Sequence, residues 1–445
     1  MEDKSAQISQ EDSLISFKVK HLNEYPIIPK KMNRISQIIF IFLSILAFSS
    51  QAQNYSILIK GGHVIDPKNN INELMDIAIN GDKIVLVAKN IDPKTAKQVV
   101  NASGLYVTPG LVDIHSHNFH NMRPGDPVAD GFTFRSGITT TVDAGSSGWK
   151  SFERFKEEVI DQSETRVLAW LNIVGEGYRG GAYEQNLADM DAKLTSIVAR
   201  RYRNHIIGIK TSHYNGPEWI PVDRAVEAGK LAGDIPVMVD FGGTTPAHSI
   251  EELFFKHLRP GDIFTHCFAE LGNSRESIVD PKTKKVKPFV FEAQKRGIVF
   301  DVGFGGISFA YSQAIPALEQ GFYPNSISTD MNKGAINGAM KDLQTVMSRF
   351  LAMGMSLQEV ILASTFNPTK EIKREDLGTL SVGSVADVAI FNMREGKFGF
   401  FDYTGYKMNA GKKLECELTI RAGKIVYNLN GISDPVIISG GRQNH

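Results

Sequence analysis

Residues 109–117 read PGLVDIHSH, and this stretch decides the fold. A short apolar run, Leu111 to Ile114, ends in two histidines, His115 and His117, that are separated by one residue. Residues i and i+2 of a strand point to the same side, so both imidazoles can face one metal ion. A buried apolar strand has no other reason to end in two such groups. The stretch therefore predicts a strand that ends at a metal site.

Apolar runs of strand length alternate with helix-length amphipathic segments throughout residues 108–371. The amphipathic segments include PVDRAVEAGKLAG and SIEELFFKHL. The expected strands are 111–114, 139–142, 167–173, 206–209, 236–239, 262–265, 298–302 and 326–329. This alternation predicts an α/β fold, a (β/α)8 TIM-like barrel. The rival is an open doubly wound sheet, but the loop DFGGTTP is neither a GxGxxG motif nor a P-loop.

Both ends of the chain have a sequence pattern that is typical of short strands joined by turns. Residues 53–107 contain SILIKGGHVIDP and DIAINGDKIVLVA, in which glycine-rich turns interrupt apolar runs. A matching texture returns in residues 372–445, in GTLSVGSVADVAIFNM and LTIRAGKIVYN. We therefore expect the two ends to build one small β-sandwich domain together.

The overall composition favours a small-molecule protein. The formal net charge is +0, from 49 Lys+Arg and 49 Asp+Glu, so no basic surface indicates nucleic acid as a partner. The only cysteines, Cys267 and Cys416, lie far apart and form no CxxC motif. They suggest neither a disulfide scaffold nor a thiolate zinc site. Any metal must therefore be held by nitrogen and oxygen ligands.

The amino-terminal residues 1–52 have the layout of an extension followed by a secretory signal peptide at about 32–52. Basic residues precede the apolar run IIFIFLSILAF, and small residues follow it: Lys30, Lys31, Arg34, Ser50 and Ala52. The run has 11 residues, whereas a spanning helix needs roughly 20, so a permanent membrane anchor is disfavoured. We expect a secreted or periplasmic protein.

Further polar residues follow the expected strands, at the end where barrel enzymes place their active sites. Taken singly, each has an ordinary structural explanation: a core histidine, a helix cap or a surface lysine. Their shared position at the same end of successive strands, in order with His115 and His117, favours a metal site instead. These residues are Lys210, Asp240, His266 and Asp330.

The motifs PGLVDIHSH, GIKTSHYNGPEW, PGDIFTHC, SISTDMN and GTLSVGSVADVAIF together resemble the amidohydrolase superfamily. More narrowly, they resemble its dihydroorotase-like amidohydrolase/deacetylase family of metallohydrolases, over roughly residues 55–430. The resemblance implies two divalent metal ions of the zinc type. By that resemblance His115 and His117 bind the first metal, Lys210 carboxylated by CO2 bridges both, and His266 binds the second. Asp330 is then a ligand of the first metal and the catalytic general base.

The implied chemistry is hydrolysis of an acyl group. A neutral lysine amine captures CO2 as a carbamate, which offers oxygen ligands that an ordinary lysine lacks. Two metal ions favour a hydroxide that attacks the acyl carbonyl, and Asp330 passes a proton to the leaving amine or alcohol. We expect a metal-dependent amidohydrolase or deacetylase, acting on an N-acyl or cyclic amide, or an acetyl ester, of a small polar metabolite.

One position departs from the family pattern. The fifth strand usually ends in a histidine that ligates the second metal, whereas PVMVDFGG places Asp240 there. Asp240 can ligate directly through oxygen. Alternatively, His213 supplies the missing imidazole and Asp240 orients it. In the third alternative the second site is weak and the enzyme works with one metal.

The sequence also offers candidate substrate contacts and alternative activities. His120, Arg179 and Tyr214 lie in loops expected near the barrel mouth and are candidates for substrate contact. The turn DAGSSG is not GxSxG, which disfavours a serine nucleophile. Alternative activities are a dihydroorotase- or hydantoinase-type ring opening and a D-aminoacylase. A non-catalytic scaffold is disfavoured by retention of the ligand set. The superfamily resemblance also makes a homo-oligomer a reasonable expectation.

Overall fold

The computed structural model describes residues 54–122, 125–240 and 243–437. The expected extension and signal peptide, residues 1–52, lie outside the described residues. Within the described ranges, no helix is both long and apolar enough to cross a membrane.

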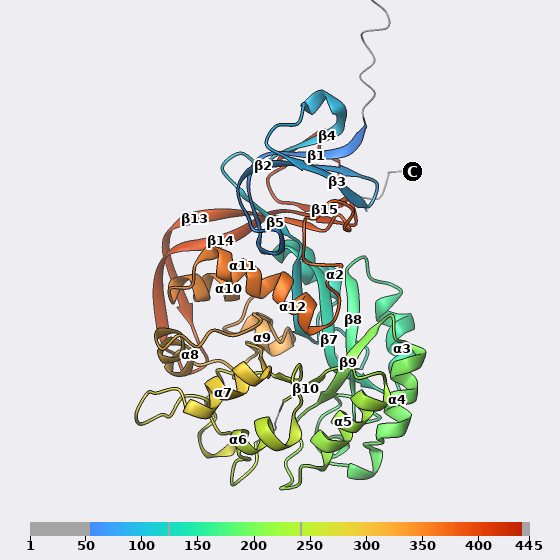
Figure 1. Ribbon diagram of the computed structural model, residues 1–445, viewed down its shortest axis with the longest axis vertical. Helices are drawn as coiled ribbons and strands as arrows, with labels where there is room; N and C mark the ends of the chain where they lie inside the picture. Colours follow the sequence, from blue (N-terminus) through green and yellow to red (C-terminus); the bar gives the residue numbers. More distant parts are fainter. Residues whose placement is uncertain (1–53, 123–124, 241–242, 438–445) are drawn as a thin grey trace, which may run out of the picture. The chain divides into compact units, whose positions relative to one another are not determined.

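Seven parallel strands form a sheet among the helices (Figure 1). They are β6 (Leu111–Ser116), β7 (Ile138–Gly148), β8 (Arg166–Asn172), β9 (Ile206–Thr211), β10 (Val237–Val239), β11 (Ile263–Phe264) and β12 (Val299–Phe300). Each strand pairs with the next one along the chain, in the order β12-β11-β10-β9-β8-β7-β6. Most of their residues are buried, as expected where helices cover a parallel sheet.

The eighth expected strand, 326–329, is an irregular segment that joins the two edges of this sheet. Isolated bridges pair Asp301 with Ser326 and Ser116 with Met331. The Asp330 amide donates to the His115 carbonyl at 2.7 Å, so the segment closes the curled sheet. Asp330 has a φ of 48°, a left-handed conformation that interrupts regular pairing. The predicted TIM-like α/β fold is confirmed, with a bridged segment in place of its last strand.

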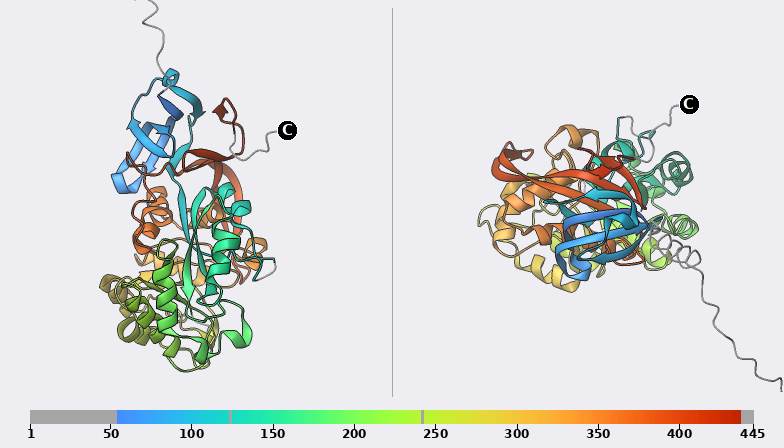
Figure 2. Two further views of the ribbon diagram at one scale, coloured as in Figure 1. Left: turned by 90° about the vertical axis from the view of Figure 1, so that its right-hand side faces the viewer. Right: turned by 90° about the horizontal axis from the view of Figure 1, so that it is seen from above.

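Short helices surround the sheet (Figures 1 and 2). Several of them begin at polar caps: Asp191 accepts from the Leu194 amide before α4, and Ser356 and Glu359 form a capping box at α11. The helices are α2 (Ala129–Thr133), α3 (Phe152–Phe155), α4 (Ala192–Arg201), α5 (Ile220–Leu231), α6 (Ile250–Glu252), α7 (Pro288–Arg296), α8 (Tyr311–Glu319), α9 (Lys333–Asn337), α10 (Leu343–Ala352), α11 (Leu357–Ser364) and α12 (Phe366–Glu371).

The two chain ends form one mixed sheet of nine strands rather than two separately bonded layers. Pairing of β5 with β13, for example Thr108 opposite Ala389, joins the amino-terminal strands to the carboxyl-terminal ones. Both groups share a buried core that includes Ile59, Val107 and Leu418. The strands are β1 (Tyr55–Asp66), β2 (Ile71–Asn80), β3 (Lys83–Ala88), β4 (Ala96–Asn101), β5 (Tyr106–Pro109), β13 (Val388–Phe401), β14 (Lys407–Arg421), β15 (Lys424–Asn428) and β16 (Ser433–Asp434).

The long hairpin of β13 and β14 extends from this sheet over the barrel helices (Figure 1). The Leu414 amide donates to Ser348 Oγ on α10 at 3.0 Å. At the hairpin turn, Asp402 accepts from the amide of Tyr311, the first residue of α8, at 2.8 Å. These bonds tie the hairpin to α10 and α8.

Glu371 ends α12 with both carboxyl oxygens buried. Burial, followed by the negative charge of Asp301, raises its pKa to about 8 from an ordinary 4.5. The folded state therefore holds a proton that the unfolded chain releases near pH 4.5. Stability associated with Glu371 is complete below that pH and is lost as the pH rises through about 8.

We expect Glu371→Gln to flatten the fall in melting temperature between pH 5 and pH 8, because glutamine cannot ionise. The loss that it removes is up to ~1.4 kcal/mol per pH unit in this window. Thermal unfolding followed at several pH values checks this. Glu375→Gln, at an exposed position nearby, is the matched control and should retain the wild-type profile. Identical profiles for E371Q and wild type would contradict the buried-acid assignment.

Candidate metal centre

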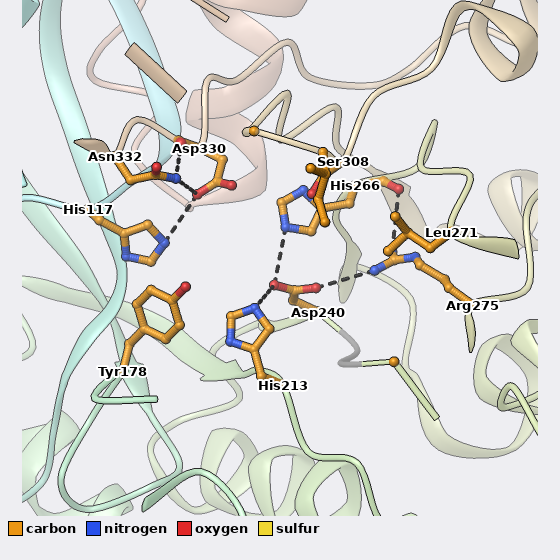
Figure 3. A pocket seen from close by; sticks show the side chains of 13 residues that line it. His117, Tyr178, His213, Asp240, His266, Leu271, Arg275, Ser308, Asp330 and Asn332 are labelled. Carbon is orange, nitrogen blue, oxygen red and sulfur yellow. Dashed lines mark hydrogen bonds and ion pairs between the residues drawn. The ribbon is translucent and has the colours of Figure 1, made fainter. Parts of the chain in front are cut away.

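A cavity of ≈ 340 Å³ lies at the carboxyl ends of the barrel strands. Figure 3 shows imidazoles and carboxylates converging on it from separate elements. The lining includes five residues singled out from the sequence: His117, His213, Asp240, His266 and Asp330. These five residues from separate strand ends and loops therefore meet at one cavity.

Three buried groups lie close enough together to hold one ion. One ligand atom from each of His115, His266 and Asp330 can be chosen so that all lie within 4.8 Å of one another. His117 approaches the same group, with its Nε2 3.2 Å from Asp330 Oδ1. Two or more imidazoles with a carboxylate are a ligand set that suits zinc and similar divalent ions. This donor set fits a metal.

The three histidines are oriented from behind. His115 Nδ1 lies 2.8 Å from Thr265 Oγ1, and His266 Nδ1 lies 2.6 Å from the Gly303 carbonyl oxygen. His117 Nδ1 lies 3.1 Å from Ser146 Oγ. Engagement of Nδ1 leaves Nε2 of each ring as the nitrogen that can bind a metal, which is the usual way that proteins orient metal-binding histidines.

Protonation states also favour metal binding. Burial, followed by the positive charge of Lys210, holds the pKa of His115 well below its usual value, so its imidazole is neutral. Burial opposes ionisation of Asp330, but the hydrogen bond and charge of His117 keep the pKa of this carboxyl lowered. A neutral imidazole beside an ionised carboxylate offers two lone pairs to a cation.

Lys210 is almost fully buried, at 1% exposure, near the end of β9. Its Nζ lies 3.2 Å from His115 Nε2, while the closest approach to Asp240 is 4.0 Å, beyond hydrogen-bond distance. Burial lowers the pKa of this amine. A larger fraction of neutral amine is what formation of a carbamate from CO2 requires, so the position fits a carboxylated lysine.

Asp240 and His213 both reach the cavity, as two of the alternatives for this departure from the family pattern require. Asp240 Oδ2 lies 3.2 Å from His266 Nε2 and 3.4 Å from His213 Nε2. Burial opposes its ionisation, yet His266 and His213 hold the pKa of Asp240 well below its usual range. Burial likewise opposes protonation of His213, but Asp240 and then Glu184 raise its pKa to about 10.

The three candidate substrate contacts do not line this cavity. Arg179 forms an ion pair with Glu176 at 3.0 Å, and the Tyr214 hydroxyl donates to Glu218 at 2.6 Å. His120 has a buried Nδ1 for which no hydrogen-bond partner is found in the described part of the chain. The structure therefore places all three outside the cavity lining.

The structure adds lining residues that sequence reasoning missed. The Tyr178 ring lies 4.7 Å from the His117 ring and 4.9 Å from the His213 ring, between centroids. Arg275 lies beyond Asp240, and Ser308 and Asn332 complete the polar wall. These residues come from loops without periodic pattern, so no local sequence signal marks them. Asp301, which accepts from Thr265 at 2.7 Å, follows β12 and was detectable as the polar residue at the end of the seventh strand.

A curled parallel sheet with histidines and a carboxylate at its carboxyl end defines a metal-binding barrel hydrolase. Comparisons with known proteins agree. A deacetylase from Enterococcus faecalis is 30% identical over 381 residues, spanning 84% of this chain and 100% of that protein. A deacetylase from Brucella anthropi is 34% identical over 347 residues, spanning 74% and 82% of the two chains. No family model matches the chain.

Solved structures show the same relationship. An adenine deaminase superposes with a TM-score of 0.77 at 30% identity, over 84% of this chain and 100% of the other. A dihydroorotase superposes with a TM-score of 0.73 at 27% identity, over 84% and 99%. The chain therefore belongs to the amidohydrolase superfamily and, within it, to the family of these deacetylases, as the motifs predicted.

Gly303 gives a test of the histidine arrangement. It has a φ of +46°, and a Cβ there would lie 2.7 Å from His266 Nδ1 and 3.0 Å from His115 Nδ1. Gly303→Ala should displace both rings and weaken zinc binding ~10-fold or more. Zinc retained after dialysis against a chelator, measured by elemental analysis, checks this.

Gly321→Ala is the matched control, because Gly321 also has a positive φ, +82°, but no neighbour within 4 Å of its Cβ position. It should lower stability by ~1 kcal/mol without altering zinc retention. Equal zinc retention in G303A and G321A would show that the two histidines do not hold the ion.

Proposed function

We propose that this chain is a divalent-metal deacetylase that hydrolyses an N-acyl amide or an acetyl ester of a small polar metabolite. The observation that carries the proposal is the buried group of His115, His266 and Asp330 at the strand ends. Membership of the deacetylase family supports the acyl group as the target. A cavity of ≈ 340 Å³ is at the small end of the range for ligand pockets, which favours a small substrate.

The proposed ligand assignment follows the family resemblance, by which the compact group of His115, His266 and Asp330 is shared between two ions. His115, His117 and Asp330 would hold one ion, preferably zinc. His266 and Asp240 would hold a second, with a carboxylated Lys210 between the two. When bound, such ions lower the pKa of water and polarise a carbonyl oxygen. Lys210 Nζ lies 3.2 Å from His115 Nε2, and Asp240 Oδ2 lies 3.2 Å from His266 Nε2. These two short distances are consistent with the proposed division of ligands.

Asp330 is the proposed proton carrier. Its Oδ1 lies 3.2 Å from His117 Nε2 and 3.4 Å from Asn332 Nδ2, so the carboxylate is held at the cavity wall. A lowered pKa keeps it ionised and able to accept a proton from the attacking water. It can then donate that proton to the nitrogen or oxygen that leaves with the rest of the substrate.

The surrounding residues would orient the substrate. Tyr178 covers the cavity between His117 and His213, and Leu271 and Ile307 supply apolar surface. Ser308 and Asn332 provide hydrogen-bonding groups for a polar substrate. A cleft of mixed character with few polar anchors is typical of sites for small metabolites.

Ring opening of a cyclic amide, as in a dihydroorotase, is the second candidate. It is favoured by the superposition on a dihydroorotase with a TM-score of 0.73. The same ligand set and the same proton carrier would serve it. A panel of N-acetyl amines, acetyl esters and cyclic amides separates the two candidates, because only deacetylation releases acetate. Ring opening without acetate release would replace the first proposal by the second.

We expect Asp330→Asn to lower kcat for acetate release by ~10²–10⁴, because an amide cannot accept the proton. Initial rates with the panel substrate that turns over best check this, with zinc content measured on the same samples. Asp234→Asn, at a side chain that is 78% exposed, is the control and should keep wild-type activity. Full activity in D330N would remove Asp330 from the mechanism.

Carboxylation of Lys210 can be observed without any assay of activity. Protein loaded with zinc in ¹³C-bicarbonate should show a protected carbamate carbon signal by NMR. Lys210→Met should abolish this signal and lower the zinc content, because the bridging oxygens are lost. Lys230→Met, on the exposed face of α5, should retain both. Absence of the signal from the wild-type protein would rule out the carboxylated lysine.

A further inference from the structure

The two oxygens of the Asp240 carboxylate face different partners. Oδ2 is directed toward the cavity, 3.2 Å from His266 Nε2. Oδ1 is directed toward a different wall residue, 3.3 Å from Arg275 Nη1 (Figure 3). One oxygen is therefore available to an ion while the other is held by a guanidinium. This division of contacts fixes the rotation of the carboxylate about its own axis.

Arg275 is a buried residue of the cavity wall rather than a surface residue. It is 4% exposed, and its guanidinium lies over the Phe264 ring, 5.0 Å from the centroid. Its Nη2 donates to the Thr265 carbonyl at 2.7 Å and approaches the His266 carbonyl at 3.4 Å. The side chain thus connects the end of β10, which carries Asp240, to the residues after β11, which carry His266.

Charge explains why a buried guanidinium belongs at this position. A carboxylate at the end of the fifth strand adds one negative charge compared with the neutral histidine of the family pattern. A buried charge without a partner is costly, and a buried pair is tolerated only where geometry and hydrogen bonds are good. The bonds of Arg275 to Asp240 and to two carbonyls meet that requirement.

We infer that Arg275 is a positioning residue that holds Asp240 toward His266 and offsets its charge, so that the Asp240–Arg275 pair takes the place of one neutral histidine. The inference rests on the proposed metal site. It predicts that the two residues depend on each other: each is harmful without its partner, and loss of both is milder than the separate losses suggest. Coupling of this kind is what a double-mutant cycle measures.

The test is zinc affinity of the full chain, measured by competition with a chelator for wild type, R275M, D240H and D240H/R275M. Melting temperatures of the metal-free proteins are a second readout. Arg275→Met should weaken zinc binding ~10-fold or more, because Asp240 loses its orienting partner. Asp240→His should also weaken it, because a guanidinium then lies buried against a neutral ring near the cation. In D240H/R275M the affinity should rise above that of D240H.

Two further variants separate charge from shape. Arg275→Lys keeps the charge but loses the forked geometry, so it should preserve more zinc affinity than R275M, whereas D240H/R275K should stay as weak as D240H. Arg349→Met is the matched control, since Arg349 is also buried, at 1% exposure, and also donates to backbone carbonyls, those of Ala339 and Met340. Its effect on stability should add to that of D240H.

The possible results distinguish the inference from the proposed function. Equal losses from R275M in both backgrounds would mean that Arg275 only supports the backbone after β11, and would overturn the inference. An increase in affinity in both backgrounds would show simple repulsion of the ion and would overturn it as well. Failure of the wild-type protein to bind zinc would overturn the proposed metal site together with the inference.

Discussion

The backbone hydrogen bond from Asp330 to His115 is the contact on which the rest of the structure depends. At 2.7 Å it ties the segment after residue 326 to β6 and closes the curled sheet. The same bond brings the side chains of two candidate ligands, distant by more than half of the barrel sequence, to the same wall. The contact that closes the curled sheet therefore also brings part of the candidate site together.

A layer of buried carboxylates supports the site from below. Asp113 accepts from the Thr329 amide at 3.1 Å, Asp143 accepts from the Ser146 amide at 2.7 Å, and Asp301 accepts from Thr265 at 2.7 Å. Burial raises the pKa of Asp113 to about 7, and it raises the pKa of Asp301 as well. These groups orient loops and hydroxyls rather than facing the cavity. They limit how far the strand ends can move.

Much of this arrangement could be predicted from the sequence, because parallel strands place their carboxyl ends together. Apolar runs identified seven strands, and the polar residues that follow them, His117, His266 and Asp330 among them, meet in the cavity. The expected eighth strand, 326–329, does not form as a regular strand. The hydroxyls of Ser326 and Ser328 donate to Asp301, and Asp330 adopts a left-handed backbone conformation. The alternation of apolar and polar residues in the sequence does not show that these serine side chains bind Asp301.

Residues that enter the site from loops were beyond sequence reasoning for a different reason. Arg275 and Tyr178 lie in segments without periodicity, so only the folded chain shows what they contact. Arg179 and Tyr214 have equally polar surroundings in sequence, yet they pair with neighbouring carboxylates outside the cavity lining. Three-dimensional context is needed to separate these two groups.

Asp240 stands where the family pattern has a histidine, and the sequence leaves open how this carboxylate acts. The structure shows which charged side chains surround it. A carboxylate in place of a neutral ring changes the charge of a buried site, and a change of that kind needs a compensating partner nearby. His213, between Asp240 and Glu184, and Arg275, behind Asp240, provide positive charge on two sides. The effect of exchanging a ligand in this barrel therefore depends on the charged side chains around it as well as on the ligand itself. A comparison of single positions cannot show whether a site with an altered ligand is lost or rebuilt, whereas the charges packed around it can.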